Sequence, residues 1–264
     1  GVMRDGMGQG AGAIGDVFAR WNTGPLASYL IEITAEVAGT VDAATGQPLI
    51  DLIVDRAGQK GTGRWTVIDA QTRAAPLPAV EAAVTARVLS GEAEARQTGA
   101  TLFGGAIGAL DLTEADLEGA LFAGKILAYS QGFSLLGAAS ADEGWALPLP
   151  RIAQIWRAGC IIRSAMLDDM AQALGDGGAV RLAFAPAFAD HLVAHIPSLR
   201  RVVAAAMAAG VPVPALAANL GYFDMLRQAR GTANMIQAQR DRFGAHGFAR
   251  TDHPGETGLH GPWI

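Results

Sequence analysis

The chain has 264 residues, enough to bury a sizeable core and near the upper end of what one domain holds. Half of the residues are apolar and only 6% are aromatic, and this composition favours closely packed helices over β-sheet. The formal net charge of −5 argues against a general nucleic-acid binder, so cations here are better suited to one small anion. The single cysteine, Cys160, cannot form an internal disulfide and fits a reducing, cytoplasmic location.

The first quarter of the chain predicts short helices. Apolar residues at helical spacing predict a helix over residues 13–21, and Pro25 is placed to open a second helix that runs to about Asp42. Residues 49–57 predict another short helix, and Thr66 is a good N-cap for the helix after it. The start resembles the end of a helix and lacks an initiator methionine and a secretory signal, which indicates a piece of a longer chain.

Between these helices lies an unusual segment, which we call the glycine-rich turn: Asp55-Arg-Ala-Gly-Gln-Lys-Gly-Thr-Gly-Arg-Trp-Thr66. Glycines let a backbone approach a ligand and direct N–H groups at it, and Lys60 and Arg64 add positive charge. The nucleotide-binding P-loop has a similar glycine spacing, but it follows a β-strand and needs a lysine and a hydroxyl where Arg64 and Trp65 stand. The pattern therefore indicates a phosphate-binding turn between helices, with a solvated turn as the alternative.

Two helices in the middle of the chain are well marked. Pro78 starts a helix on which Arg87 lies close to the apolar stripe, an unusual position for a solvated arginine. From Thr113, apolar residues sustain one long helix to about Leu136, with Thr113 and Asp116 as its capping box. We expect this long helix to be the centre of the fold.

The second half of the sequence predicts further helices, two of which are separated by prolines within one apolar stretch. Helices are expected at about residues 152–174, 179–196, 198–209, 214–229 and 232–243. Gly159-Cys160 is expected to form a junction within the first of them, and residues 175–178 are expected to form a loop. No charge interrupts residues 202–223, but Pro212 and Pro214 divide them into two buried helices, so we expect no membrane span. Roughly ten or more helices in all predict an all-α fold, a large multi-helix domain over residues 1–243.

Residues 244–264 differ from the rest and predict a C-terminal tail. They hold three of the five histidines and show little apolar periodicity. Phe248 and Trp263 indicate that the tail is anchored and not disordered.

Other chemistry-bearing residues favour structural roles. His191 and His195 lie at helical spacing but lack a third ligand, so we expect no metal site. Cys160 stands beside two isoleucines and is expected to be a small buried hydrophobe, not a nucleophile. Three carboxylates without evident partners are expected to be solvated or to lie at helix ends: Asp168, Asp169 and Asp241.

Several separated motifs identify a family. In chain order they are Phe18-Ala-Arg-Trp-Asn-Thr-Gly24, Ser28-Tyr-Leu-Ile-Glu-Ile-Thr34, Ala57-Gly-Gln-Lys-Gly-Thr-Gly-Arg-Trp-Thr66, Lys125-Ile-Leu-Ala-Tyr-Ser-Gln-Gly-Phe133, Ile155-Trp-Arg-Ala-Gly-Cys-Ile-Ile-Arg-Ser164, Gln237-Ala-Gln-Arg-Asp241 and Phe243-Gly-Ala-His246. Together they resemble 6-phosphogluconate dehydrogenase over essentially the whole chain. The resemblance implies an NADP-dependent, decarboxylating oxidoreductase of the pentose phosphate pathway, which converts 6-phosphogluconate to ribulose 5-phosphate and carbon dioxide.

The family has an N-terminal Rossmann domain and a large all-helical domain, and this chain resembles the helical part only. No predicted strand is followed by the glycine fingerprint of a dinucleotide site. The family's general base and acid, a lysine and a glutamate, would lie upstream of residue 1, so no catalytic residue is assigned here. Neither Glu32 nor Lys125 is expected to replace them, and the isolated chain is predicted to be inactive.

The resemblance also assigns binding residues. Lys60, Thr62 and Arg87 match family positions that hold the substrate, chiefly its phosphate. Arg240 and His246 match residues that reach into the neighbouring subunit's site, which implies a homodimer with exchanged tails. Because the base, the acid and the nucleotide fingerprint are missing, the alternative is a non-catalytic dimerisation or sugar-phosphate-binding module.

Overall fold

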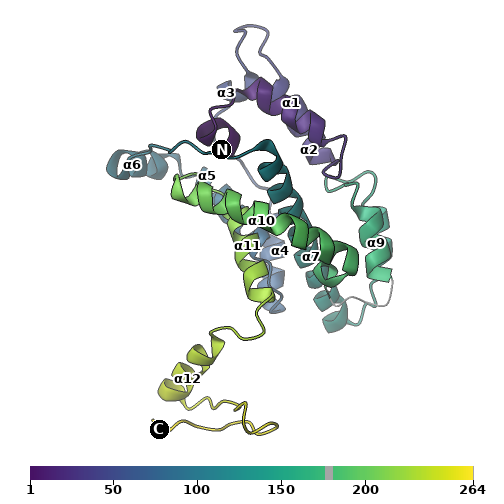
Figure 1. Cartoon of the computed structure of the whole chain (residues 1–264), viewed down its shortest axis with the longest axis vertical. Helices are drawn as coiled ribbons and strands as arrows, with labels where there is room; N and C mark the ends of the chain where they lie inside the picture. The colour runs from purple at the N-terminus through teal and green to yellow at the C-terminus, as the bar shows by residue number, and fades with distance from the viewer. Residues whose placement is uncertain (176–180, 264) are drawn as a thin grey trace. The chain divides into compact units, whose positions relative to one another are not determined.

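The structure is a computed structural model that describes residues 1–175 and 181–263, and Figure 1 shows its helices. Contacts divide the chain into two compact units, residues 1–221 and residues 222–264. Over the described residues the chain forms helices and three isolated antiparallel bridges but no β-strand. The predicted all-α, multi-helix fold is confirmed.

The helical elements follow one another through short connections. In chain order they are η1 (Val2–Gly6), α1 (Ala11–Trp21), α2 (Tyr29–Gly39), α3 (Leu49–Leu52), α4 (Thr62–Thr72), α5 (Pro78–Ser90), α6 (Ala93–Phe103), α7 (Glu114–Glu143), α8 (Leu149–Ile155), α9 (Leu167–Gly175), η2 (Leu182–Phe184), α10 (Pro186–Ala208), α11 (Pro214–Leu226) and α12 (Ala233–Gly244). Among the described residues, none of these helices has both the length and the apolar character needed to cross a lipid bilayer.

The long helix α7 is the core of the first unit, as predicted. Its capping box is present, since the Thr113 hydroxyl accepts from the Asp116 N–H at 3.1 Å and the Asp116 carboxylate accepts from the Thr113 N–H at 3.1 Å. An N-cap of this kind contributes about 1 kcal/mol to helix stability. Helix α10 packs along α7 (Figure 1), and the two helices approach closely because Gly119 leaves no side chain opposite Ser198.

Helix α10 corrects the prediction of two helices at 179–196 and 198–209. From Pro186 onwards the described chain forms one helix that continues through Pro197; residues 179 and 180 lie outside the described residues. A proline inside a helix removes a single N–H hydrogen bond, and burial on both sides outweighs that loss. Leu192 before the proline and Leu199 after it are 3% and 0% exposed.

Three predicted helix boundaries were wrong in the first quarter of the chain. Helix α2 begins at Tyr29 and not at Pro25, because the preceding residues pair with a distant loop, where Ala27 O accepts from Ala165 N at 2.9 Å. The predicted helix over 49–57 is only the single turn α3. Helix α4 begins at Thr62, and Thr66 does not cap it but donates its hydroxyl to Thr62 O at 2.9 Å.

The prediction for residues 152–174 was correct only in its junction. Residues 156–166, which include Gly159 and Cys160, are not helical and separate α8 from α9. The loop predicted over 175–178 falls almost wholly outside the described residues.

Two polar connections fix α4 and α5 to α7. The buried amide of Gln131 on α7 accepts from the Ala79 N–H of α5 at 3.1 Å and donates to Asn219 on α11 at 2.8 Å. The buried Asn219 amide in turn donates to the Gly124 carbonyl of α7 at 3.1 Å. Buried amides that are fully hydrogen-bonded specify one packing arrangement, because any shift would leave a polar group unsatisfied.

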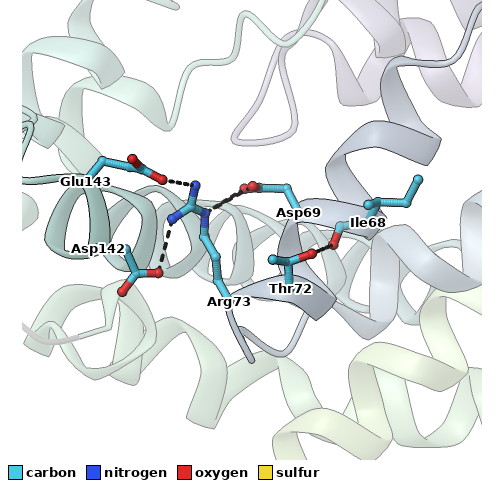
Figure 2. A network of polar contacts seen from close by, with 6 residues as sticks. All are labelled: Ile68, Asp69, Thr72, Arg73, Asp142 and Glu143. Atoms are coloured by element: carbon cyan, nitrogen blue, oxygen red, sulfur yellow. Dashed lines mark hydrogen bonds and ion pairs between the residues drawn. The ribbon is translucent and has the colours of Figure 1, made fainter.

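The second connection is a salt-bridge cluster at the far end of α4, shown in Figure 2. Arg73, the C-cap residue of α4, binds Asp69 on its own helix and both Asp142 and Glu143 at the end of α7, with N–O distances of 3.0, 3.1 and 2.8 Å. The Arg73 side chain is only 14% exposed. One guanidinium therefore joins the ends of two helices.

The second unit begins with the last residues of α11, from Tyr222, and contains α12 with residues 245–263 folded back on it. Phe248 and Leu259 exchange backbone hydrogen bonds of 2.8 and 3.0 Å, and the rings of Phe248 and Trp263 lie 6.1 Å apart. The prediction that Phe248 and Trp263 anchor the tail is confirmed within this unit.

Candidate functional site

The glycine-rich turn leads directly into the first turn of α4. Gly61 is the N-cap residue, with φ +103° and ψ −17°, a left-handed conformation that favours glycine. No side chain caps the helix at this residue, so its first N–H groups point towards solvent with the positive end of the helix dipole. Lys60 and Thr62 flank Gly61, and both are exposed.

Hydrogen bonds hold the beginning of this turn against the end of α5, where Arg87 lies. The Ser90 hydroxyl accepts from the Ala57 N–H at 3.1 Å and donates to the Arg87 carbonyl at 2.7 Å. Arg96 of α6 donates to the Asp55 carboxylate and to the Asp55 carbonyl, both at 2.7 Å. The turn and the backbone of Arg87 are thus connected through one hydroxyl.

Helices α4 and α5 also contact each other directly. A Cβ at Gly63 would lie 3.0 Å from Val84, so the glycine permits this approach. Gly63 near the start of α4 faces Val84, whereas Gln71 near its end donates to Glu81 at 2.6 Å, earlier in α5. Thr62 and Arg87 therefore lie at the same end of the pair. The sequence motifs that carry Lys60, Thr62 and Arg87 are brought together by these contacts.

The three side chains are available to a ligand. Arg87 is exposed, whereas its place near the apolar stripe of the sequence predicted a less solvated position. Within the part of the chain that the structure describes, the side chains of Lys60, Thr62 and Arg87 form no hydrogen bond or ion pair. Two cations, a hydroxyl and an uncapped helix N-terminus are the groups that bind a phosphate dianion well.

The second unit presents the other two predicted binding residues. Arg240, on the last turns of α12, is exposed and makes one long contact of 3.5 Å with the Gln237 side chain. His246 is exposed and its ring lies 6.0 Å from that of Phe243. Both side chains therefore face solvent.

Asp241 lies between Arg240 and His246 in sequence and in the last turn of α12, which agrees with the expected helix-end position, but it is not solvated. Its carboxylate is fully buried and is surrounded by hydrogen-bond donors from the tail. Sequence reasoning missed this residue because its partners lie 6 to 22 positions away in a segment without periodicity. The available signal was an aspartate directly beside a proposed binding arginine.

Glu32 and Lys125, which were not expected to act in catalysis, form structural contacts. The Lys125 ammonium donates to the Leu26 carbonyl at 3.1 Å, and burial lowers the pKa of Lys125 to about 8. Glu32 pairs with Arg163.

The histidines and Cys160 do not form a catalytic cluster in the described structure. The rings of His191 and His195 pack edge-on against Phe122 at 5.2 and 4.9 Å, and burial lowers the pKa of His195. Over residues 1–175 and 181–263, no three His, Cys, Asp or Glu side chains are grouped as a metal ion would need. Cys160 is half-buried, and its Sγ accepts from the Ile162 N–H, so the prediction of a buried hydrophobe was wrong. Cys160 is not fully buried because residues 156–166 form an irregular loop at the surface.

The acidic pair at 168 and 169 lies in the first turn of α9, where carboxylates interact favourably with the helix dipole. Asp168 also pairs with Arg157. The predicted helix-end position is confirmed for both residues.

Comparison with known proteins gives a consistent result. The family model described as "6-phosphogluconate dehydrogenase, C-terminal domain" matches residues 1–263. A decarboxylating 6-phosphogluconate dehydrogenase of Synechococcus elongatus is 42% identical over all of this chain and 57% of its own length. Two enzymes of Bacillus subtilis, one NADP(+)-dependent and one NAD(+)-dependent, are 40% and 42% identical over 100% and 92% of this chain.

A solved structure agrees with these sequence comparisons. Plasmodium falciparum 6-phosphogluconate dehydrogenase superposes with a TM-score of 0.95 at 39% identity, over 99% of this chain and 57% of that protein. That enzyme was studied without ligand, with NADP+ and with 6-phosphogluconate. The chain spans a little over half the length of the curated relatives it matches. By sequence and by fold, this chain belongs to the 6-phosphogluconate dehydrogenase C-terminal domain family.

Proposed function

We propose that this chain is the substrate-binding part of a 6-phosphogluconate dehydrogenase, which oxidatively decarboxylates 6-phosphogluconate to ribulose 5-phosphate and carbon dioxide. The observation that carries the proposal is the joining of the glycine-rich turn to the end of α5 by Ser90, which places Lys60 and Thr62 at the same end as Arg87. The identity of the proposed substrate, 6-phosphogluconate, is inferred from the family to which the chain belongs.

The binding chemistry follows from these groups. A phosphate dianion would accept charge-assisted hydrogen bonds from Lys60 and Arg87, and the guanidinium can donate two parallel bonds. Thr62 adds a hydroxyl, and the N–H groups of α4 add the positive end of a helix dipole. Each hydrogen bond to a charged group contributes about 1.5–3 kcal/mol, so loss of one should weaken binding by at least about tenfold.

Arg240 and His246 are proposed to complete the site of a neighbouring subunit in a homodimer with exchanged tails. Their exposure on the second unit supports a role outside their own unit. A sedimentation profile that is purely monomeric at micromolar protein concentration would contradict this part of the proposal.

The cofactor is proposed to be NADP, which accepts the hydride when the substrate is oxidised. We assign neither its main binding site nor the general base and acid to residues of this chain, and we propose a cytoplasmic location. NAD remains the competing cofactor, since the relatives in Bacillus subtilis include one enzyme of each kind.

The first experiment tests activity. The 264-residue chain is mixed with saturating 6-phosphogluconate and NADP, and NADPH absorbance is followed. We expect no turnover alone and restored turnover when a separate Rossmann half from a relative is added. Sustained turnover by the chain alone would refute the proposal that this chain supplies substrate binding but not the general base, the general acid and the main cofactor site. Substrate binding without any restored activity would favour the non-catalytic sugar-phosphate-binding module.

The second experiment tests the binding site. Calorimetric titration with 6-phosphogluconate compares the wild type with Arg87→Ala, and Arg56→Ala serves as the control, since Arg56 is an exposed arginine of the same turn. We expect Arg87→Ala to weaken binding by about tenfold or more and Arg56→Ala to leave it unchanged. Equal affinities of the wild type and Arg87→Ala would remove Arg87 from the site.

A further inference from the structure

The carboxylate of Asp241 is the centre of the second unit. It lies in the last turn of α12, is 0% exposed, and is surrounded by a segment in which most side chains are exposed. Oδ1 accepts from the Gly247 N–H at 3.0 Å and from His260 Nδ1 at 2.7 Å. Oδ2 accepts from the Gly261 N–H at 3.0 Å and from Trp263 Nε1 at 2.9 Å.

These four bonds match the hydrogen-bonding capacity of an ionised carboxylate. Two oxygens offer about four lone-pair positions, and each oxygen here has two donors. A buried charge is stable only when it is compensated in this way. Burial alone would raise the pKa of Asp241, but the hydrogen bonds from Gly261, His260, Trp263 and Gly247 outweigh burial and hold the pKa well below its usual range.

All four donors come from the tail, at both of its ends. Gly247 lies just after α12, whereas His260, Gly261 and Trp263 lie after the tail has turned back. The carboxylate therefore closes the tail into a loop whose two ends meet on one residue of the helix.

This closure determines where the two proposed binding residues stand. Arg240 directly precedes Asp241, and His246 directly precedes Gly247. Gly247 is held twice, since its N–H donates to Asp241 and its carbonyl accepts from the Gln237 amide at 2.5 Å. The short segment from Asp241 to Gly247 is thus pinned at both ends, which fixes His246 relative to Arg240.

We infer that Asp241 is a positioning residue, which presents Arg240 and His246 as one preformed unit to the bound sugar phosphate. The inference rests on the proposed function of those two residues. Preformed donors bind a ligand more tightly than mobile ones, because their ordering cost is met during folding and not during binding.

The test compares two isosteric substitutions in the full chain. Asp241→Asn keeps the shape but removes the charge and directs an amide N–H at tail donors, whereas Asp252→Asn alters an exposed aspartate of the same tail, paired with Arg250. By calorimetry with 6-phosphogluconate we expect Asp241→Asn to weaken binding by about tenfold or more, as when one charged hydrogen bond is misplaced, and Asp252→Asn to have no effect.

A double-mutant cycle separates positioning from general stabilisation. If Asp241 acts through His246, then Asp241→Asn should cost much less affinity in a His246→Ala background than in the wild type. Equal costs in both backgrounds would overturn the inference. So would wild-type affinity of Asp241→Asn in a sample whose Trp263 indole N–H resonance shows that the tail has opened.

A second variant keeps the test decisive if Asp241→Asn does not fold. Trp263→Phe removes one of the four donors and leaves the carboxylate with three, so we expect a smaller loss of affinity in the same direction. Unchanged affinity of Trp263→Phe, in a sample whose tail amides have lost their protection from hydrogen exchange, would also overturn the inference. Failure of the wild type to bind 6-phosphogluconate would instead refute the proposed function.

Discussion

The glycine-rich turn and the second unit both present proposed binding side chains to solvent, but these side chains are held in different ways. The turn is tied to its neighbours by bonds at exposed positions, through Ser90 and Arg96, around a single left-handed glycine. The tail is folded around one buried carboxylate, Asp241. The same task is performed by a local backbone conformation in one region and by a long-range polar centre in the other.

The difference predicts different responses to perturbation. Bonds at exposed positions contribute little each, because water competes for both partners. A buried charge with four partners opens only as a whole, since partial opening leaves donors or the charge uncompensated. The structure of the turn should therefore be lost gradually as single bonds break, whereas the tail should open in one step.

Acidification should produce the largest effect, and it should act on the tail. The pKa of Asp241 is lowered in the folded tail, so the stabilisation is fully present above the unfolded value of about 3.9 and is lost as the pH falls through the folded value. We expect the Trp263 indole N–H resonance to stay unchanged down to about pH 4 and to move towards its free position at lower pH. Opening near neutral pH would show that the charge of Asp241 does not control the tail.

Gly247→Ala should have the next largest effect. Gly247 has φ +68°, and a Cβ there would lie 2.8 Å from the backbone Cα of Gly258. The left-handed conformation and the overlap with backbone together should destabilise the tail by about 2 kcal/mol or more. Hydrogen exchange of the tail amides measures this loss.

Gly258→Ala is the matched control. Gly258 has a similar φ of +72°, but a Cβ there would have no atom within 4 Å. It should therefore show the conformational cost alone, about 1 kcal/mol. Equal protection in the two variants would mean that the tail adapts to the overlap.

Gly61→Ala applies the same change to the turn and should have a moderate effect. Its φ is +103°, but the nearest atoms to a Cβ are those of the Trp65 side chain at 3.4 Å, an ordinary contact. We expect a cost of about 1 kcal/mol and a fewfold weaker binding of 6-phosphogluconate in calorimetry. Gly58→Ala, at a position with neither a positive φ nor a close neighbour, should leave affinity unchanged.

Ser90→Ala should have the smallest effect on the turn. It removes the hydroxyl that joins the Ala57 N–H to the Arg87 carbonyl, both at exposed positions, so we expect a loss of only about 0.5 kcal/mol in binding. Ser134→Ala is the control, because the Ser134 hydroxyl donates to the Ser130 carbonyl of its own helix and does not join the turn. If both variants bind 6-phosphogluconate as the wild type does, the hydroxyl does not position the turn.

How much of this could be predicted depended on the range of the interactions. The start of α5 at Pro78 and the capping box of α7 at Thr113 are set by neighbouring residues, and both predictions were correct. The interruption expected at Pro197 was wrong, because packing along α7 outweighs the local preference of proline. Periodicity and propensity describe neighbours, and they contain no information on which distant surface a helix will meet.

The candidate site divides in the same way. Glycines and cations that stand together in sequence marked Lys60 and Arg64. The family resemblance selected Lys60 among them and added Thr62, Arg87, Arg240 and His246. Asp241 could not be recognised, since its burial depends on a tail that returns after nearly twenty residues. Ser90 was equally hidden, because its partner Ala57 lies 33 positions earlier.

The cluster around Arg73 in Figure 2 has a consequence for the order of assembly. Arg73 fixes the far end of α4 through Asp142 and Glu143, which follow it by 69 and 70 positions. During synthesis at about 5–20 residues per second, α4 would wait on the order of ten seconds for these partners to emerge. Until then the helix that follows the glycine-rich turn is joined to α5 but not to α7, and synthesis of the end of α7 completes its attachment.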